Sequence, residues 1–179
     1  MSLTDVQEDR LVVSLPEDRY FRLEKSETYA KVKAHALTEV DFGWVKDGED
    51  GLWLMELKDY GENRPSIASA HQKLRNRLPK NIAHAVLLVS STWAETPFGL
   101  NLRQDLEDTF PDFPEEAVPI RAVAVINAGT VDQSSFWALT TALRSALSAF
   151  DLEMVAVLPA SSNRLEEELG IEIQYDPPE

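Results

Sequence analysis

The 179-residue sequence contains no cysteine, which excludes a disulfide framework and any metal site built from thiolates. Its seven glycines form neither a phosphate-binding lysine loop nor a dinucleotide-binding fingerprint. The three histidines, His35, His71 and His84, are far apart in the sequence and lack zinc-ligand spacing. A nucleophile-elbow serine motif is also missing. These absences remove the commonest nucleotide-binding, zinc-dependent and serine-hydrolase sites from consideration.

Long apolar runs are missing as well. No run approaches the length of a membrane span, and residues 1–10 are polar and acidic, unlike a signal peptide. We therefore expect a cytoplasmic protein that does not enter a membrane. An apolar content of 44% is enough for a packed core, and the length predicts a single domain over residues 1–179.

Positive charge is scarce, and the formal net charge is −14. Residues 1–80 hold 13 basic and 15 acidic residues, whereas residues 81–179 hold 4 basic and 16 acidic residues. Basic side chains gather in Arg19–Lys33 and Lys73–Lys80. These segments are either solvated helix faces or a phosphate-contacting surface, and composition alone leaves both interpretations open.

The most informative stretch is Val40–Tyr60, which has the pattern of a β-hairpin. Two runs rich in aromatic and branched residues flank the turn cluster Asp47–Gly51. A four-residue loop pairs Lys46 with Gly51, and counting back along the strands places Asp41 opposite Glu56. One face then carries only apolar residues: Val40, Phe42, Trp44, Trp53, Met55 and Leu57. The other face gathers Asp41, Glu56 and Lys58, with Glu39 beyond them.

A slip of one residue would divide the apolar set between the two faces, so the hydrophobic pattern favours the register that brings Asp41 and Glu56 together. Two facing carboxylates repel each other unless a positive charge lies between them. Lys58 can neutralise only one of them. The arrangement therefore suggests a hard divalent cation with oxygen ligands.

Asp41 and, after a spacer of fourteen residues, the tripeptide Glu56-Leu57-Lys58 resemble the PD-(D/E)XK motif of the restriction-endonuclease-like nuclease superfamily. The resemblance covers roughly residues 26–90, although only the three motif residues are specific. The position before Asp41 is Val40, where the motif has proline. In this superfamily the Asp and the Glu ligate magnesium, and the Lys lies beside the water that attacks a phosphodiester.

The resemblance implies an α/β fold with a restriction-endonuclease-like core of helix, β-hairpin, helix and strand, built on a mixed central sheet. It also implies a metal-dependent nuclease that uses Mg²⁺ or Mn²⁺ and acts on nucleic acid, with DNA as the expected polymer. Asp41, Glu56 and the Leu57 carbonyl would hold the metal, and Lys58 would orient the water. A preceding helix often presents a further acid, for which Glu27 is the candidate and Glu24 the alternative. A following helix often lends a Gln or a Lys, which makes Gln72 a candidate beside Lys73.

The rest of the chain predicts further α/β elements, with C-terminal βαβ elements over about residues 91–179. Residues 1–10 are expected to be a polar lead-in, a helix start is possible after Ser14, and Arg19–Lys25 is left unassigned. The expected elements are a strand or strap at Leu11–Leu15, helices from Ser26 and at Pro65–Leu78, a buried strand at Ile82–Ser90, a helix at Leu100–Thr109, a strand at Ile120–Asn127, a helix at Val131–Phe150, a strand at Met154–Leu158, a helix at Asn163–Leu169 and an edge strand at Ile171–Tyr175.

Two alternatives accompany the nuclease hypothesis. The hairpin acids and Lys58 could form an ordinary cross-strand ion cluster. The chain could also be a catalytically inactive member of the same fold, a regulatory or assembly subunit whose acidic C-terminal half, including Asp105–Glu116, docks a basic protein partner.

Overall fold

The fold is described from a computed structural model, which covers residues 3–17, 20–34, 37–45, 51–61, 67–106, 110, 119–128 and 133–175. The expected turn residues Asp47–Asp50 and the loop residues 111–118 lie outside this description. The described part is a mixed α/β structure with one five-stranded and one three-stranded sheet.

The five-stranded sheet has the order β3-β4-β5-β6-β7 and contains both antiparallel and parallel pairs. Strands β3 (Tyr20–Phe21), β4 (Phe42–Val45) and β5 (Leu52–Gly61) pair antiparallel. Strands β6 (Ile120–Ala128) and β7 (Met154–Pro159) continue the sheet parallel to β5. The expected mixed sheet and the strands over residues 120–127 and 154–158 are thus confirmed.

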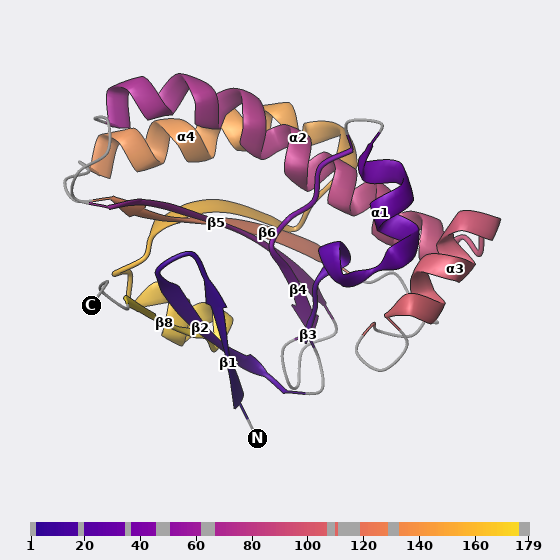
Figure 1. Cartoon of the computed structure of the whole chain (residues 1–179). Coiled ribbons are helices and arrows are strands. Elements are labelled where there is room, and N and C mark those ends of the chain that lie inside the picture. The colour runs from indigo at the N-terminus through magenta and orange to yellow at the C-terminus, as the bar shows by residue number, and fades with distance from the viewer. Residues whose placement is uncertain are drawn as a thin grey trace.

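Two helices, α2 (Ile67–Trp93) and α4 (Gln133–Ala146), lie side by side over one face of this sheet (Figure 1). The core between helices and sheet contains Leu54, Ala124 and Val157 from the strands and Ile82 and Leu139 from the helices. Val40 also belongs to this core, which corrects its expected place on the opposite face. Because both faces of the sheet are covered, β6 has an almost continuous apolar sequence.

The opposite face is covered by the smaller sheet, of order β1-β2-β8 (Figure 1). Its strands are β1 (Leu3–Glu8), β2 (Leu11–Pro16) and β8 (Glu172–Tyr175). A second core, between the two sheets, contains Leu11, Val13, Trp44, Trp53 and Leu169.

The expectation of a polar lead-in over residues 1–10 is therefore wrong for Leu3–Glu8, which pairs with β2 as an edge strand. Its side chains are alternately exposed and half-buried, so its sequence has few of the apolar residues that would have predicted a strand. The possible helix start after Ser14 is wrong too, because Ser14 lies within β2. The predicted edge strand near residue 171 is confirmed as β8, which pairs with β2 alone among the described strands.

The largest correction concerns α2. The sequence predicted a helix ending before Pro79 and then a buried strand at Ile82–Ser90, but one 27-residue helix runs through both segments. Proline inside a helix removes one backbone hydrogen bond and usually breaks the helix, but tertiary packing can override this preference. Here Leu78, Ile82, Ala85 and Val89 are all buried, at the three- and four-residue spacing of a helix face.

The remaining elements frame the fold. Helix α1 (Glu27–Lys33) begins after Ser26 as predicted, and the Ser26 hydroxyl accepts a hydrogen bond from the Tyr29 N–H at 3.0 Å. Helix α3 (Pro97–Asp105) begins three residues before its predicted start, because Thr96 caps it. Short helical turns lie at η1 (Leu23–Lys25), η2 (Ser148–Phe150) and η3 (Leu165–Leu169), so the long helix predicted up to residue 150 is instead α4 followed by η2. None of the described helices combines the length and hydropathy that a bilayer crossing requires.

Candidate functional site

The hairpin of β4 and β5 has the register that the sequence predicted. Phe42 pairs with Met55 and Val45 with Leu52, and one step beyond this ladder Asp41 stands across from Glu56. Asp41 directly precedes β4, and its Oδ2 atom accepts a hydrogen bond from the Leu57 backbone N–H at 2.6 Å. The pairing is held by Trp44 and Trp53, which stack with ring centroids 5.7 Å apart.

The Lys58 ammonium group lies between the two acids. Its Nζ atom is 2.7 Å from Glu56 Oε1 and 3.8 Å from Asp41 Oδ2. The same atom donates a hydrogen bond to the Leu57 carbonyl oxygen at 2.6 Å. The three motif residues and the Leu57 carbonyl therefore meet in one cluster, in which a positive charge already contacts the oxygens proposed as metal ligands.

Helix α2 supplies a further member, Asn81, that the sequence analysis did not identify. Its Nδ2 donates to Glu56 Oε1 at 2.7 Å, and both side chains are buried, with Asn81 3% and Glu56 1% exposed. Glu56 Oε2 and Asn81 Oδ1 are buried and have no hydrogen-bond partner among the described residues. Buried polar atoms are rarely left unsatisfied, so these two oxygens are suited to bind a ligand, a water or an ion.

Burial raises the pKa of Asp41 from 3.8 to about 6, and the nearby charge of Glu56 adds to this effect. Lys58 and the Leu57 N–H oppose the increase without cancelling it. Burial also raises the pKa of Glu56, against the lowering effects of Lys58, Asn81 and Arg77. Burial alone would lower the pKa of Lys58, but the charges of Glu56 and Asp41 outweigh it and the net pKa is raised. The acids thus resist ionisation while the lysine keeps its proton.

More charged groups surround this cluster on the side of the N-terminal strands. Arg22 Nη2 lies 2.5 Å from both Glu8 Oε2 and Glu24 Oε1. Burial raises the pKa of Glu8, and the charge of Asp41 is its second cause. Burial raises the pKa of Glu39 as well, with contributions from Glu24 and Asp41. Acids whose pKa is raised by burial and by neighbouring negative charges are therefore found beyond the pair Asp41 and Glu56.

The two supplementary candidates lie apart from these contacts. Glu27 is exposed in the first turn of α1, near the point where Asp105 Oδ2 accepts hydrogen bonds from Ser26 Oγ at 2.6 Å and Thr28 N at 2.7 Å. Glu24, the alternative, acts electrostatically on Glu8 and Glu39.

Gln72 is exposed, and so is Lys73. Gln72 precedes Asn81 by nine residues, about two and a half helical turns, which places it on the opposite side of α2. Arg77 is one turn before Asn81 and contributes to the pKa of Glu56. On the side of α2 that faces Glu56, the described residues therefore include Arg77 and Asn81.

The donor set suits a hard divalent cation, since Asp41, Glu56 and the Leu57 carbonyl offer only oxygen atoms. The described residues include no group of three or more His, Asp or Glu arranged around a metal, so water would complete the coordination. Glu56 Oε2 is buried and has no hydrogen-bond partner among the described residues, so it could bind the cation directly. Glu56 Oε1 and the Leu57 carbonyl could bind the cation only if Lys58 moved away from them.

Comparison of the chain with protein-family models, with curated proteins and with solved structures finds no match.

Proposed function

We propose that the chain is a metal-dependent nuclease of the restriction-endonuclease-like class, which hydrolyses phosphodiester bonds in nucleic acid, with DNA as the expected substrate. The observation that carries this proposal is the meeting of Asp41, Glu56, Lys58 and the Leu57 carbonyl at one point of the hairpin. The side chains of Asp41 and Lys58 remain 19% and 21% exposed, so the cluster can be reached from solvent.

The order of elements supports the same class. Helix α1 is followed by the hairpin β4–β5, then by helices α2 and α3, and then by strand β6, which is parallel to β5. Apart from the additional helix α3, this is the helix, hairpin, helix and strand order that the resemblance implies. The last strand is β6 rather than the segment Ile82–Ser90, which belongs to α2.

In the proposed mechanism Asp41, Glu56 and the Leu57 carbonyl would hold one or two Mg²⁺ or Mn²⁺ ions, which would supply Lewis acidity at the scissile phosphate and activate a water. Asn81 holds the Glu56 carboxylate against α2 and so fixes its orientation. Lys58, whose raised pKa keeps it protonated, donates hydrogen bonds and is unsuited to accept a proton. It would orient the attacking water and offset charge developing on the phosphate.

Calorimetric titration with Mg²⁺ or Mn²⁺ tests the proposal. Binding should be present in the wild-type protein and lost in Asp41→Asn and Glu56→Gln. Glu172→Gln makes the same charge change on exposed strand β8 and should bind like the wild type. Cleavage of DNA should follow the same pattern. Lack of metal binding by a folded wild-type protein would refute the nuclease proposal.

One observation favours a second candidate, the non-catalytic member of the same fold. Lys58 already contacts Glu56 and the Leu57 carbonyl, so the cluster neutralises part of its own charge without a metal. In that case the acidic C-terminal half would dock a basic protein partner. Asp105, the first residue of the tract Asp105–Glu116, caps α1, and most of the tract lies outside the described residues. Absence of metal binding, together with binding to a basic protein, would favour this candidate.

A further inference from the structure

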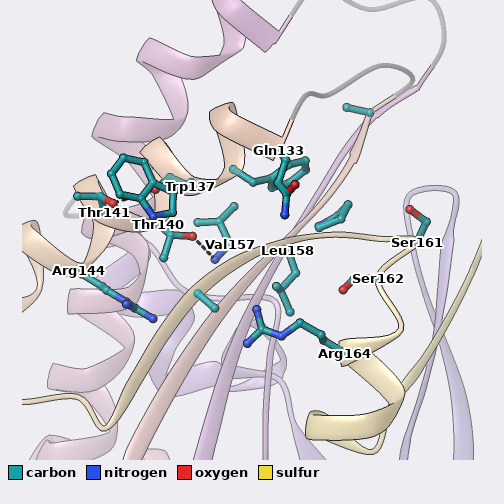
Figure 2. A pocket seen from close by; sticks show the side chains of 14 residues that line it. Gln133, Trp137, Thr140, Thr141, Arg144, Val157, Leu158, Ser161, Ser162 and Arg164 are labelled. Atoms are coloured by element: carbon teal, nitrogen blue, oxygen red, sulfur yellow. Dashed lines mark hydrogen bonds between the residues drawn. The ribbon is translucent and has the colours of Figure 1, made fainter.

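A cavity of about 650 Å³ lies along the outer edge of β7, and Figure 2 shows the side chains that line it. One wall comes from α4 and includes Trp137, Thr140 and Arg144. The other comes from the end of β7 and the segment after it, and includes Leu158 and Arg164. The volume falls within the range typical of small-molecule sites. None of its lining residues belongs to the cluster around Asp41.

The edge of β7 at this cavity is already protected against the addition of another strand. The Thr140 hydroxyl accepts the hydrogen bond of the Val157 N–H at 3.0 Å, and Arg144 Nε donates to the Val155 carbonyl at 2.8 Å. Pro159, at the end of the strand, has no N–H to offer. An extended peptide would have to break these contacts, so the cavity suits a compact ligand better.

The charge of the lining is unusual for this part of the chain. Residues 81–179 contain four basic and 16 acidic residues, yet two of the four, Arg144 and Arg164, line this cavity, and none of the acidic residues that the structure describes does. Arg164 makes a two-point ion pair with Glu168, with both N–O distances 2.8 Å. Among the described residues, Arg144 is engaged only through its Nε. The lining therefore favours a negatively charged ligand, because guanidinium groups match the geometry of phosphate.

Trp137 adds an aromatic surface to this wall. Its side chain is 72% exposed on α4, although large apolar side chains are usually at least partly covered. Phe136, Val157 and Leu158 give the cavity an apolar side, and Ser161 and Ser162 add hydroxyl groups to its lining. An exposed indole beside guanidinium groups can stack a nucleobase while the guanidinium groups bind its phosphate.

We propose that this cavity binds a nucleotide, with the base against Trp137 and the phosphate between Arg144 and Arg164. The nucleotide is either free or one unit of a strand. The choice of a nucleotide over other aromatic anions rests on the proposed function. The cavity is nevertheless a separate site, because Glu56 pairs with Ala124 and Ala124 with Val157. Two inter-strand spacings, roughly 10 Å, therefore separate β5 from β7 at this level.

The test is a titration of the full-length protein in EDTA, with dAMP, deoxyadenosine, inorganic phosphate and a six-nucleotide oligodeoxyadenylate as probes. Calorimetry gives the affinities, and quenching of tryptophan fluorescence reports stacking. We expect dAMP to bind at least about tenfold more tightly than deoxyadenosine or phosphate, because only dAMP uses both the indole and the guanidinium groups. Equal affinity for dAMP and the oligonucleotide indicates a free nucleotide, whereas tighter oligonucleotide binding indicates a strand; each supports the proposal.

Variants separate the two walls of the cavity. Trp137→Leu should weaken dAMP binding about tenfold and remove the quenching, and Arg164→Gln should weaken dAMP but not deoxyadenosine. Arg75→Gln, the same charge change at an exposed position of α2, should leave the affinity within twofold. Thermal melts establish that each variant is folded.

The proposal is overturned if dAMP fails to bind at millimolar concentration, or if phosphate binds as tightly as dAMP and Trp137→Leu changes nothing. Asp41→Asn should not alter dAMP binding in EDTA. Loss of metal binding at the hairpin and loss of nucleotide binding at β7 are therefore distinguishable results.

Discussion

Asp41→Asn should stabilise the metal-free protein at neutral pH, although it removes a proposed metal ligand. The pKa of Asp41 is raised from 3.8 to about 6, chiefly by burial and then by Glu56. A pKa difference of one corresponds to about 1.4 kcal/mol, so the ionised carboxylate costs the folded state roughly 3 kcal/mol. Asparagine removes the charge and keeps an oxygen that can accept the Leu57 N–H. Since the amide is also desolvated, roughly 3 kcal/mol is an upper limit.

The sign of the pH dependence follows from linkage. Between pH 3.8 and about 6 the folded protein retains a proton on Asp41 that the unfolded chain has lost, so the free energy of unfolding falls as the pH rises through this window. Asparagine does not titrate. The advantage of Asp41→Asn over the wild type should therefore grow by about 2 kcal/mol between pH 4.5 and 7.5, and level off above the folded pKa.

Urea unfolding of both proteins, followed by circular dichroism across this pH range, measures the difference in their free energies of unfolding. The contributions of the other titrating groups are nearly the same in both proteins and largely cancel in this difference. Glu172→Gln, on exposed strand β8, serves as the matched control and should show no comparable growth. At pH 7.5, Mg²⁺ should narrow the gap by stabilising only the wild type. If Asp41→Asn is less stable than the wild type at pH 7.5, or if its advantage shrinks as the pH rises, the assigned charge frustration at Asp41 is wrong.

Three further outcomes follow from the same structure. Lys58→Met should keep metal binding but reduce cleavage by at least about 100-fold. Calorimetry and a cleavage assay on the same sample test this, and a loss of both functions together would contradict the role given to Lys58. Asn81→Leu should weaken metal binding about 10- to 100-fold by releasing Glu56, whereas Gln72→Ala on the other side of α2 should have little effect; equal affinities in the two variants would contradict this role for Asn81. Pro79→Ala should increase the free energy of unfolding by up to about 3 kcal/mol and so raise the midpoint of urea unfolding. A lower midpoint would mean that Pro79 stabilises α2.

The hairpin could be predicted from the sequence because side chains in a strand alternate with a period of two. A slip of one residue would separate Phe42 and Trp44 from Trp53 and Met55, and the register that the four-residue loop sets also determines what stands opposite Asp41. The structure has this register and places the four residues in the core beneath the smaller sheet. Here local pattern and tertiary packing agree, so geometric reasoning on a short segment was sufficient.

Asn81 could not be found in the same way, because its position depends on a helix that local signals contradict. Pro79 indicates a helix end, and the apolar run after it is typical of a buried strand. The exposed Leu87, at 55%, is a helical feature of that run, since a central strand would bury it. Once α2 continues past Pro79, Asn81 lies one turn beyond Arg77 and faces Glu56. The missed site residue and the missed helix thus have the same cause.

The position of Lys58 connects the fold to the proposed chemistry. A buried acid with a raised pKa lowers the stability of the metal-free protein at neutral pH, and this hairpin contains two of them at facing positions. Lys58 relieves only part of that cost, because it contacts Glu56 Oε1 at 2.7 Å but lies 3.8 Å from Asp41, and Glu56 Oε2 stays unpartnered among the described residues. A divalent cation would satisfy both acids at once and release Lys58 toward the substrate, which is why the residual electrostatic cost favours the metal-dependent candidate over the non-catalytic one.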